Sequence, residues 1–128
     1  MKSRPKLATI SDEMKQWSAL LGQELSSWTA VKSRRMFGMM GFYRNNKIFA
    51  VLPRTRTLGT PNSVAFKLYH QTPRSLKLLR GDCRIVSSKG KAAGWIAFEV
   101  NAPRDLNDAL KWFDLAYRNC LLKTNSKS

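Results

Sequence analysis

Few side chains in this chain of 128 residues have the chemistry of an acid–base or nucleophilic catalyst. Its one histidine, His70, would need a neighbouring nucleophile or carboxylate to work as a general base, and the sequence does not place one. Cys83 precedes Arg84, a cation that favours the reactive thiolate. A turn histidine and an idle thiol explain both residues more simply. We therefore expect a non-enzymatic protein without catalytic residues; the alternative is a small enzyme or ligand-binding domain that uses Cys83 or His70.

The residues that would hold a metal or a phosphate group lack the required spacing. Cys83 and Cys120 are too few and too far apart for a disulfide framework or a metal cluster, and they indicate reduced thiols. The segment 38–41, Gly-Met-Met-Gly, is not followed by the Lys-Ser/Thr pair and the helix of a phosphate-binding loop. We expect no metal and no cofactor.

Net charge is the property in which this chain departs most from the average. It has 23 Lys and Arg against 8 Asp and Glu, a formal charge of +15, which attracts nucleic acid, anionic lipid or an acidic protein. Arginines beside threonines in loops suit phosphate contacts, because a guanidinium donates two parallel hydrogen bonds. The alternative is a charge scattered over all solvated faces. Since no motif for reading a nucleic-acid sequence is visible, we expect weak polyanion binding without sequence preference. The candidate residues are Arg54, Arg56, Arg74, Lys77, Arg80, Lys89 and Lys91.

A β-hairpin is predicted at the centre of the chain. Two apolar, aromatic-rich runs, Arg34–Arg44 and Ile48–Leu52, flank the polar step Asn45–Lys47, and Asn tolerates the positive φ of tight hairpin turns. Gly38 and Gly41 interrupt the first run, and we expect a bulge or a close backbone approach at each.

The strands of this hairpin are apolar on both faces, which indicates that both faces are covered. We expect Phe37 to lie in the core and Gly38 to be structural. We also expect that the helices leave part of one face uncovered, and that a homodimer forms through it. That face includes Tyr43, Phe49 and Val51.

The same hairpin resembles the signature of the TfoX N-terminal domain family, as a divergent, stand-alone member. The matching residues are the run 35–38 (Arg-Met-Phe-Gly), Gly41 and the strand 47–50 (Lys-Ile-Phe-Ala). Farther on, residues 64–67 sit where the family has a strand that ends in a basic residue, and residues 94–100 with a helix from Asp105 match its closing strand and helix. The resemblance covers about Met14 to Leu121. The signature residues are Arg35, Met36, Phe37, Gly38, Gly41, Phe49 and Lys67.

The resemblance implies a function as well as a fold. The family is tied to regulators of bacterial competence, in which this domain is regarded as a regulatory or interaction module with no established catalytic residues. It implies a two-layer arrangement in the order α-β(3)-α-β(2)-α. For this chain it implies a regulatory or interaction module. Together with the apolar hairpin face and the net charge, we expect its partner to be a protein, a second copy of itself, or nucleic acid.

Periodicity and capping residues predict the remaining elements. Ser11 caps a helix whose apolar stripe is Met14, Trp17, Leu21, Leu25 and Trp28. Thr72 to Gly81 has the N-cap, first-turn proline and terminal glycine of a short helix. Strands are predicted at 64–69, 83–86 and 95–100, an exposed loop at 53–62 and a flexible basic connection at 87–94. The last helix runs from about Pro103 to Lys123, with the stripe Leu106, Leu110, Phe113, Tyr117 and Leu121.

These elements predict an α+β fold: two layers, with a single antiparallel sheet of about five strands and helices packed on it. We expect a basic flexible arm at residues 1–10, one domain at 11–123 and a frayed tail at 124–128. No run approaches the roughly 20 apolar residues of a membrane span. We therefore expect a cytoplasmic protein without a membrane partner.

Overall fold

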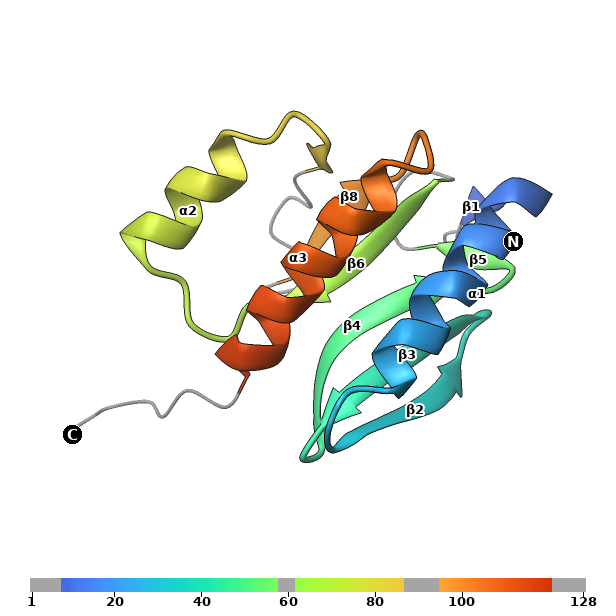
Figure 1. Ribbon diagram of the computed structural model, residues 1–128, viewed down its shortest axis with the longest axis horizontal. Coiled ribbons are helices and arrows are strands. Elements are labelled where there is room, and N and C mark those ends of the chain that lie inside the picture. Colours follow the sequence, from blue (N-terminus) through green and yellow to red (C-terminus); the bar gives the residue numbers. More distant parts are fainter. Residues whose placement is uncertain (1–7, 58–61, 87–94, 121–128) are drawn as a thin grey trace, which may run out of the picture.

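The computed structural model describes residues 8–57, 62–86 and 95–120 (Figure 1). Within these ranges the chain forms three helices, one large sheet and one small two-stranded sheet. The helices are α1 (Asp12–Ser26), α2 (Pro73–Arg80) and α3 (Asp105–Asn119). The strands are β1 (Ala8–Thr9), β2 (Val31–Met36), β3 (Met39–Arg44), β4 (Lys47–Pro53), β5 (Arg56–Thr57), β6 (Ser63–Lys67), β7 (Ile85–Val86) and β8 (Trp95–Glu99).

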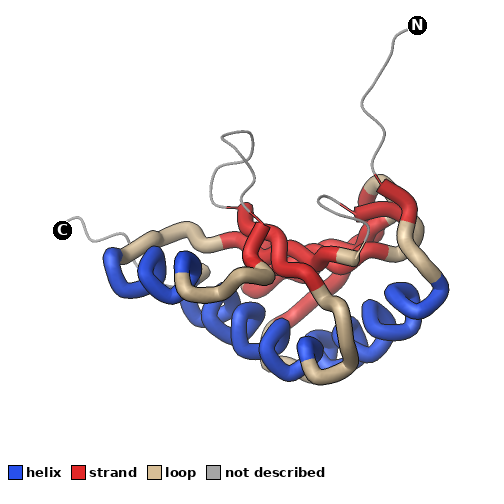
Figure 2. The backbone as a smooth tube through the Cα atoms, turned by 90° about the horizontal axis from the view of Figure 1, so that it is seen from above, coloured by secondary structure: helices blue, strands red, loops and turns tan. Residues whose placement is uncertain are grey.

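The large sheet is antiparallel throughout and has the strand order β2-β3-β4-β6-β8-β7. Five of its strands have five or more residues, and the edge strand β7 has two. Figure 2 shows the three helices on one side of this sheet. The predicted two-layer α+β class is therefore confirmed. Its element order differs from the prediction in one respect, because four strands of the large sheet, not three, precede α2.

The additional strand arises at Phe37 and Gly38. The run 34–44 was predicted as one interrupted strand, but it contains two strands, β2 and β3, joined by a tight turn. Phe37 has φ +48° and Gly38 has φ +79°, and positive φ at both central residues is the geometry of a type I′ hairpin turn. The prediction was wrong here because a bulky aromatic residue rarely adopts positive φ, so Phe37 gave no sign of a turn.

The second hairpin turn lies where it was predicted. Asn45 has φ +51° and Asn46 has φ +69°, between the paired residues Arg44 and Lys47. A bulge follows at the start of β4, because Tyr43 pairs with Ile48 while Phe42 pairs with Ala50. The intervening residue Phe49 therefore points to the same side as Ala50, toward the helices.

The main core lies between the sheet and the helices. α1 packs on β2 and β4, and α3 packs on β4 and β6. At its centre the fully buried Phe49 stacks on Trp28 (ring centroids 6.3 Å apart) and meets Tyr117 edge-on (5.5 Å). The predicted inward residues of β6, Val64 and Phe66, are also fully buried here.

The opposite face of the sheet has its own small cluster. Met39, Val51 and Ala65 are buried there, with Met36, Ile48 and Trp95 packed around them. Tyr43, Phe49 and Val51 thus do not share one face, because the bulge turns Phe49 into the helix-side core. The surface on which a homodimer was predicted is not present in that form.

Part of the predicted arm and of the predicted exposed loop is ordered. Ala8 and Thr9 of β1 pair with Thr57 and Arg56 of β5, and Pro53 is buried at the end of β4. The ladder forms because both short segments can satisfy their backbone groups on each other. The predicted connection at 87–94 and tail at 124–128 lie outside the described residues.

The helix ends follow the predicted capping chemistry. The Ser11 hydroxyl accepts the Met14 N–H (3.1 Å), and Thr72 and Ser75 form a reciprocal capping box before α2. α3 begins two residues later than predicted, at Asp105, whose carboxylate accepts the backbone N–H groups of Asn101 and Ala102. In the described ranges, no helix is long and apolar enough to cross a membrane.

Candidate functional site

The predicted polyanion-binding residues that the structure describes lie in two separate places. Arg54 follows β4 and Arg56 lies in β5, at the end of the sheet beneath the start of α1. The remaining described candidates lie on α2, at the other end of the molecule in Figure 1. Lys89 and Lys91 lie outside the described residues. The candidates on α2 are Arg74, Lys77 and Arg80.

Acidic residues are distributed unevenly along the chain, and the site predictions did not include this signal. From Leu25 to Gly81 the chain has eleven Lys and Arg residues and no Asp or Glu. Strands β2, β3 and β4 lie wholly within this stretch, and the edge strand β2 exposes Lys32, Arg34 and Arg35. The hairpin strands therefore have positive charge that no acid on the same strands neutralises.

Three cations from different elements gather at the β2–β3 turn. Lys15 of α1, Arg35 of β2 and Arg54 line one surface hollow of about 530 Å³. Phe37, Gly38 and Thr55 line the same hollow. We call the group of Lys15, Arg35, Phe37, Arg54 and Thr55 the hairpin-tip site. It provides two guanidinium groups, an ammonium and a hydroxyl, which are the groups that bind phosphate and carboxylate.

Backbone hydrogen bonds hold this site together. The Gly38 carbonyl oxygen accepts the N–H groups of Arg54 (3.0 Å) and Thr55 (2.9 Å). The end of β4 is thereby tied to the turn between β2 and β3. Lys15 has one long ion pair, 3.7 Å to Asp12, and both side chains are largely exposed, so this pair holds Lys15 only weakly.

Phe37 is not the core residue that was predicted. Its side chain is 83% exposed, and the buried residue next to the turn is Met39. The turn explains the difference, because both central residues of a two-residue hairpin loop lie beyond the last paired residues, here Met36 and Met39. The site thus has a large aromatic side chain in solvent among three cations.

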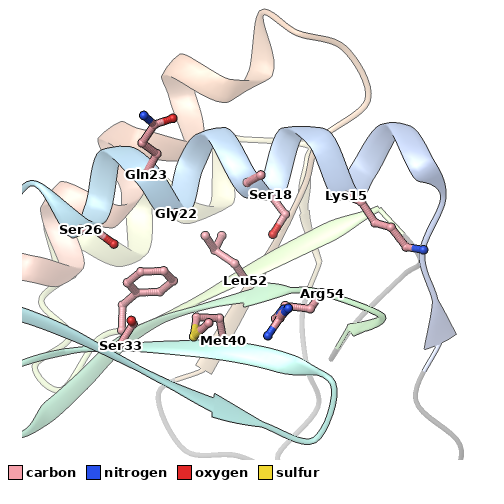
Figure 3. Close-up of a pocket in the computed structure, with 11 residues that line it drawn as sticks. Lys15, Ser18, Gly22, Gln23, Ser26, Ser33, Met40, Leu52 and Arg54 are labelled. Carbon is pink, nitrogen blue, oxygen red and sulfur yellow. The ribbon is translucent and has the colours of Figure 1, made fainter.

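A groove continues from the hairpin-tip site between α1 and the strands. Figure 3 shows Lys15 and Arg54 at one end of it, with Leu52 and Met40 between the helix and the sheet. Its volume is about 490 Å³, within the range of small-molecule pockets. α1 lies close to the sheet at Gly22, where an added Cβ would be in ordinary contact with Phe42 and Leu52 at 3.4 and 3.5 Å.

The family-signature residues have separate structural positions. Arg35, Phe37 and Gly38 belong to the β2–β3 turn region, and Phe49 lies in the core. Gly41 lets Met36 lie across β3, since a Cβ at position 41 would lie 2.8 Å from the Met36 Sδ atom. On the same face, the Lys67 Nζ atom lies 4.7 Å from the Tyr69 ring centroid and 5.8 Å from that of Trp95.

Arg84, the cation next to Cys83, has a structural role. Cys83 is exposed in the turn after α2, while Arg84 donates hydrogen bonds to Asp82 and Asp105 and pairs with Asp108. Burial by itself raises the pKa of Asp82 and of Asp105. Arg84 donates hydrogen bonds to both carboxylates, and the Asn101 backbone donates one to Asp105. These hydrogen bonds outweigh the effect of burial, so both pKa values lie below the ordinary value for Asp.

His70 and Cys120 also have structural surroundings. The backbone N–H of His70 donates to Asn119 Oδ1 (2.9 Å), and the backbone carbonyl oxygen of His70 accepts from Asn119 Nδ2 (2.7 Å). These two bonds fix the turn after β6 on the end of α3. Burial raises the pKa of the Cys120 thiol. Within the part of the chain that the structure describes, no three His, Cys, Asp or Glu residues are placed to hold a metal ion.

No family model, curated protein or solved structure matches this chain. The relation to the TfoX N-terminal domain family stays a prediction from the residues that resemble it.

Proposed function

We propose that this protein is a non-enzymatic regulatory or interaction module, similar in role to the TfoX N-terminal domain, that binds nucleic acid as a polyanion. The observation that supports this proposal is the hairpin-tip site, where Lys15, Arg35 and Arg54 converge on one hollow. A phosphate placed there meets two planar guanidinium groups, one ammonium and the Thr55 hydroxyl.

The binding is expected to be electrostatic and independent of sequence. Its free energy comes from the counterions that the cations release from the phosphate backbone. The affinity therefore falls as salt rises, and the logarithm of the binding constant decreases against the logarithm of salt with a slope near −0.9 for each duplex phosphate neutralised.

The cations of α2 are expected to contribute less. Arg74 and Lys77 line a separate hollow in which Asp82 is paired with Arg84. Two cations there remain for an incoming phosphate, against three at the hairpin-tip site. Arg80 is exposed near the end of the same helix. These residues add to the overall positive potential, which steers a polyanion toward the protein.

The test is a titration of fluorescent DNA, single-stranded and duplex, followed by anisotropy at several salt concentrations. The double variant Arg35→Gln/Arg54→Gln should weaken binding and reduce the duplex salt slope by roughly two. A matched control, Arg104→Gln/Lys111→Gln, removes the same charge from exposed positions at α3 and should change the slope little.

Two results would contradict the proposal. The absence of binding even at low salt would exclude nucleic acid and leave a protein as the partner. An equal loss of DNA affinity in the two double variants would mean that cations over the whole surface contribute alike, and that the hairpin-tip site has no special role.

A further inference from the structure

Phe37 combines two properties that rarely occur together. Its side chain is 83% exposed, and its backbone has φ +48°, in the left-handed region that bulky residues avoid. Burial therefore does not offset the conformational cost of a phenylalanine at this position. Asn or Gly would suit the turn better, as Asn45 and Asn46 do in the following turn. Unfavourable backbone of this kind is concentrated at functional sites.

The surroundings of Phe37 indicate which ligand would use it. The exposed ring lines the same hollow as Lys15, Arg35 and Arg54. Proteins that bind single-stranded nucleic acid combine cations along the backbone with aromatic rings on which bases stack. In a duplex the bases are already stacked on one another, so an exposed ring reaches a base only by unstacking a base step. An unpaired strand offers its bases without this cost.

We propose that Phe37 is a base-stacking residue and that the hairpin-tip site takes a single strand of nucleic acid. An unpaired base lies on the Phe37 ring, and the phosphates on either side of it contact Arg35, Arg54 and Lys15. The inference rests on the proposed function, and it adds the class of nucleic acid and the residue that distinguishes it.

An anionic membrane surface is the main competing partner for an exposed aromatic residue among cations. Interfacial binding depends on a larger apolar area than one ring provides. The other large apolar side chains that are exposed in the described ranges, Leu20 and Leu78, lie on α1 and α2, and neither lines this hollow. One ring with three cations fits one base with its phosphates better.

The experiment compares three fluorescent ligands of equal length by anisotropy at one low salt concentration: a single strand, its duplex, and an abasic strand that has the phosphates without the bases. The wild-type protein should bind the single strand roughly tenfold more tightly than the abasic strand. In Phe37→Asn this advantage should disappear, while binding of the abasic strand is unchanged. Phe37→Trp should keep the advantage, because it restores an aromatic face.

Folding of Phe37→Asn is checked by circular dichroism and thermal melting, and Asn suits the positive φ at this position. Equal binding of the single and abasic strands, unaltered in Phe37→Asn, would overturn the stacking role and leave the proposed polyanion binding intact. The absence of binding to all three ligands would instead overturn the proposed function and this inference with it. Loss of binding to phosphatidylserine vesicles in Phe37→Asn, with single-strand binding unchanged, would assign Phe37 to a membrane.

Discussion

The backbone N–H of Arg54 donates a hydrogen bond of 3.0 Å to the carbonyl oxygen of Gly38. The bond joins the end of β4 to the turn between β2 and β3, and the Thr55 N–H donates to the same oxygen at 2.9 Å. The position of the Arg54 side chain therefore depends on the backbone at Gly38. Substitutions that change the backbone at Gly38 should affect both the stability of the hairpin and the arrangement of the cations around it.

Gly38→Ala tests this dependence. At φ +79° an L residue is strained, and the variant should lose about 1–2 kcal/mol of unfolding free energy, measured by urea denaturation. Gly81→Ala is the matched control, because the added Cβ would meet its nearest atoms at 3.6 Å and φ there is −82°. A Gly38→Ala variant as stable as the control would show that the turn adapts without strain.

Phe37 and Phe49 should respond to substitution in opposite ways. Phe49→Ala removes a fully buried ring and should cost about 3–5 kcal/mol. Phe37→Asn removes an exposed ring and suits a left-handed backbone, so its unfolding free energy should be unchanged or higher. Denaturant unfolding of both variants measures the difference. A large loss for Phe37→Asn would mean that the ring is covered in solution.

Gly41→Ala should destabilise the side of the sheet that faces away from the helices. The added Cβ would lie 2.8 Å from the Met36 Sδ atom and 3.0 Å from the Ile48 Cδ1 atom. Both atoms lie near the ends of flexible side chains, so the cost should be at the low end for overpacking, about 1 kcal/mol. Met36→Ala removes the nearer atom, so a double-mutant cycle should show partial rescue in the pair. Additive losses would indicate that the two positions do not contact each other.

The cluster around Arg84 should make stability depend on pH. The folded-state pKa values of Asp82 and Asp105 lie below the ordinary value for Asp. Both carboxylates therefore contribute fully to the free energy of unfolding above the unfolded-state pKa of about 4. This contribution is lost as the pH falls through the lower folded-state pKa values. Unfolding free energies measured near neutral pH and near pH 3 should differ less in Asp105→Asn than in the wild type.

Asp114→Asn is the control for this pH dependence, since the Asp114 side chain is 43% exposed and pairs with Arg118 within α3. Its difference between the two pH values should match that of the wild type. Arg84→Met should lower the free energy of unfolding by roughly 2–3 kcal/mol near neutral pH. This loss is small for a buried ion pair, because 26% of the Arg84 side chain is exposed. A pH dependence that is the same in all variants would assign it to other carboxylates.

The parts of this protein that depend on local chemistry could be predicted from its residues. Ser11 and Thr72 cap α1 and α2 because their hydroxyls accept N–H groups three residues away, and this needs no tertiary contact. Asn45 and Asn46 form the β3–β4 turn because Asn tolerates positive φ. The α+β class follows from such elements and from the apolar patterns between them.

Which side chains meet depends on long-range packing and could not be predicted in this way. Phe37 lies in an apolar run, and hydrophobicity alone cannot distinguish a core ring from an exposed ring when the strand breaks at an unfavourable residue. Phe49 faces the helices because of a bulge that depends on strand register. Lys15, Arg35 and Arg54 are separated along the chain and converge because α1, β2 and β4 pack together, an outcome set by long-range burial that no local pattern encodes.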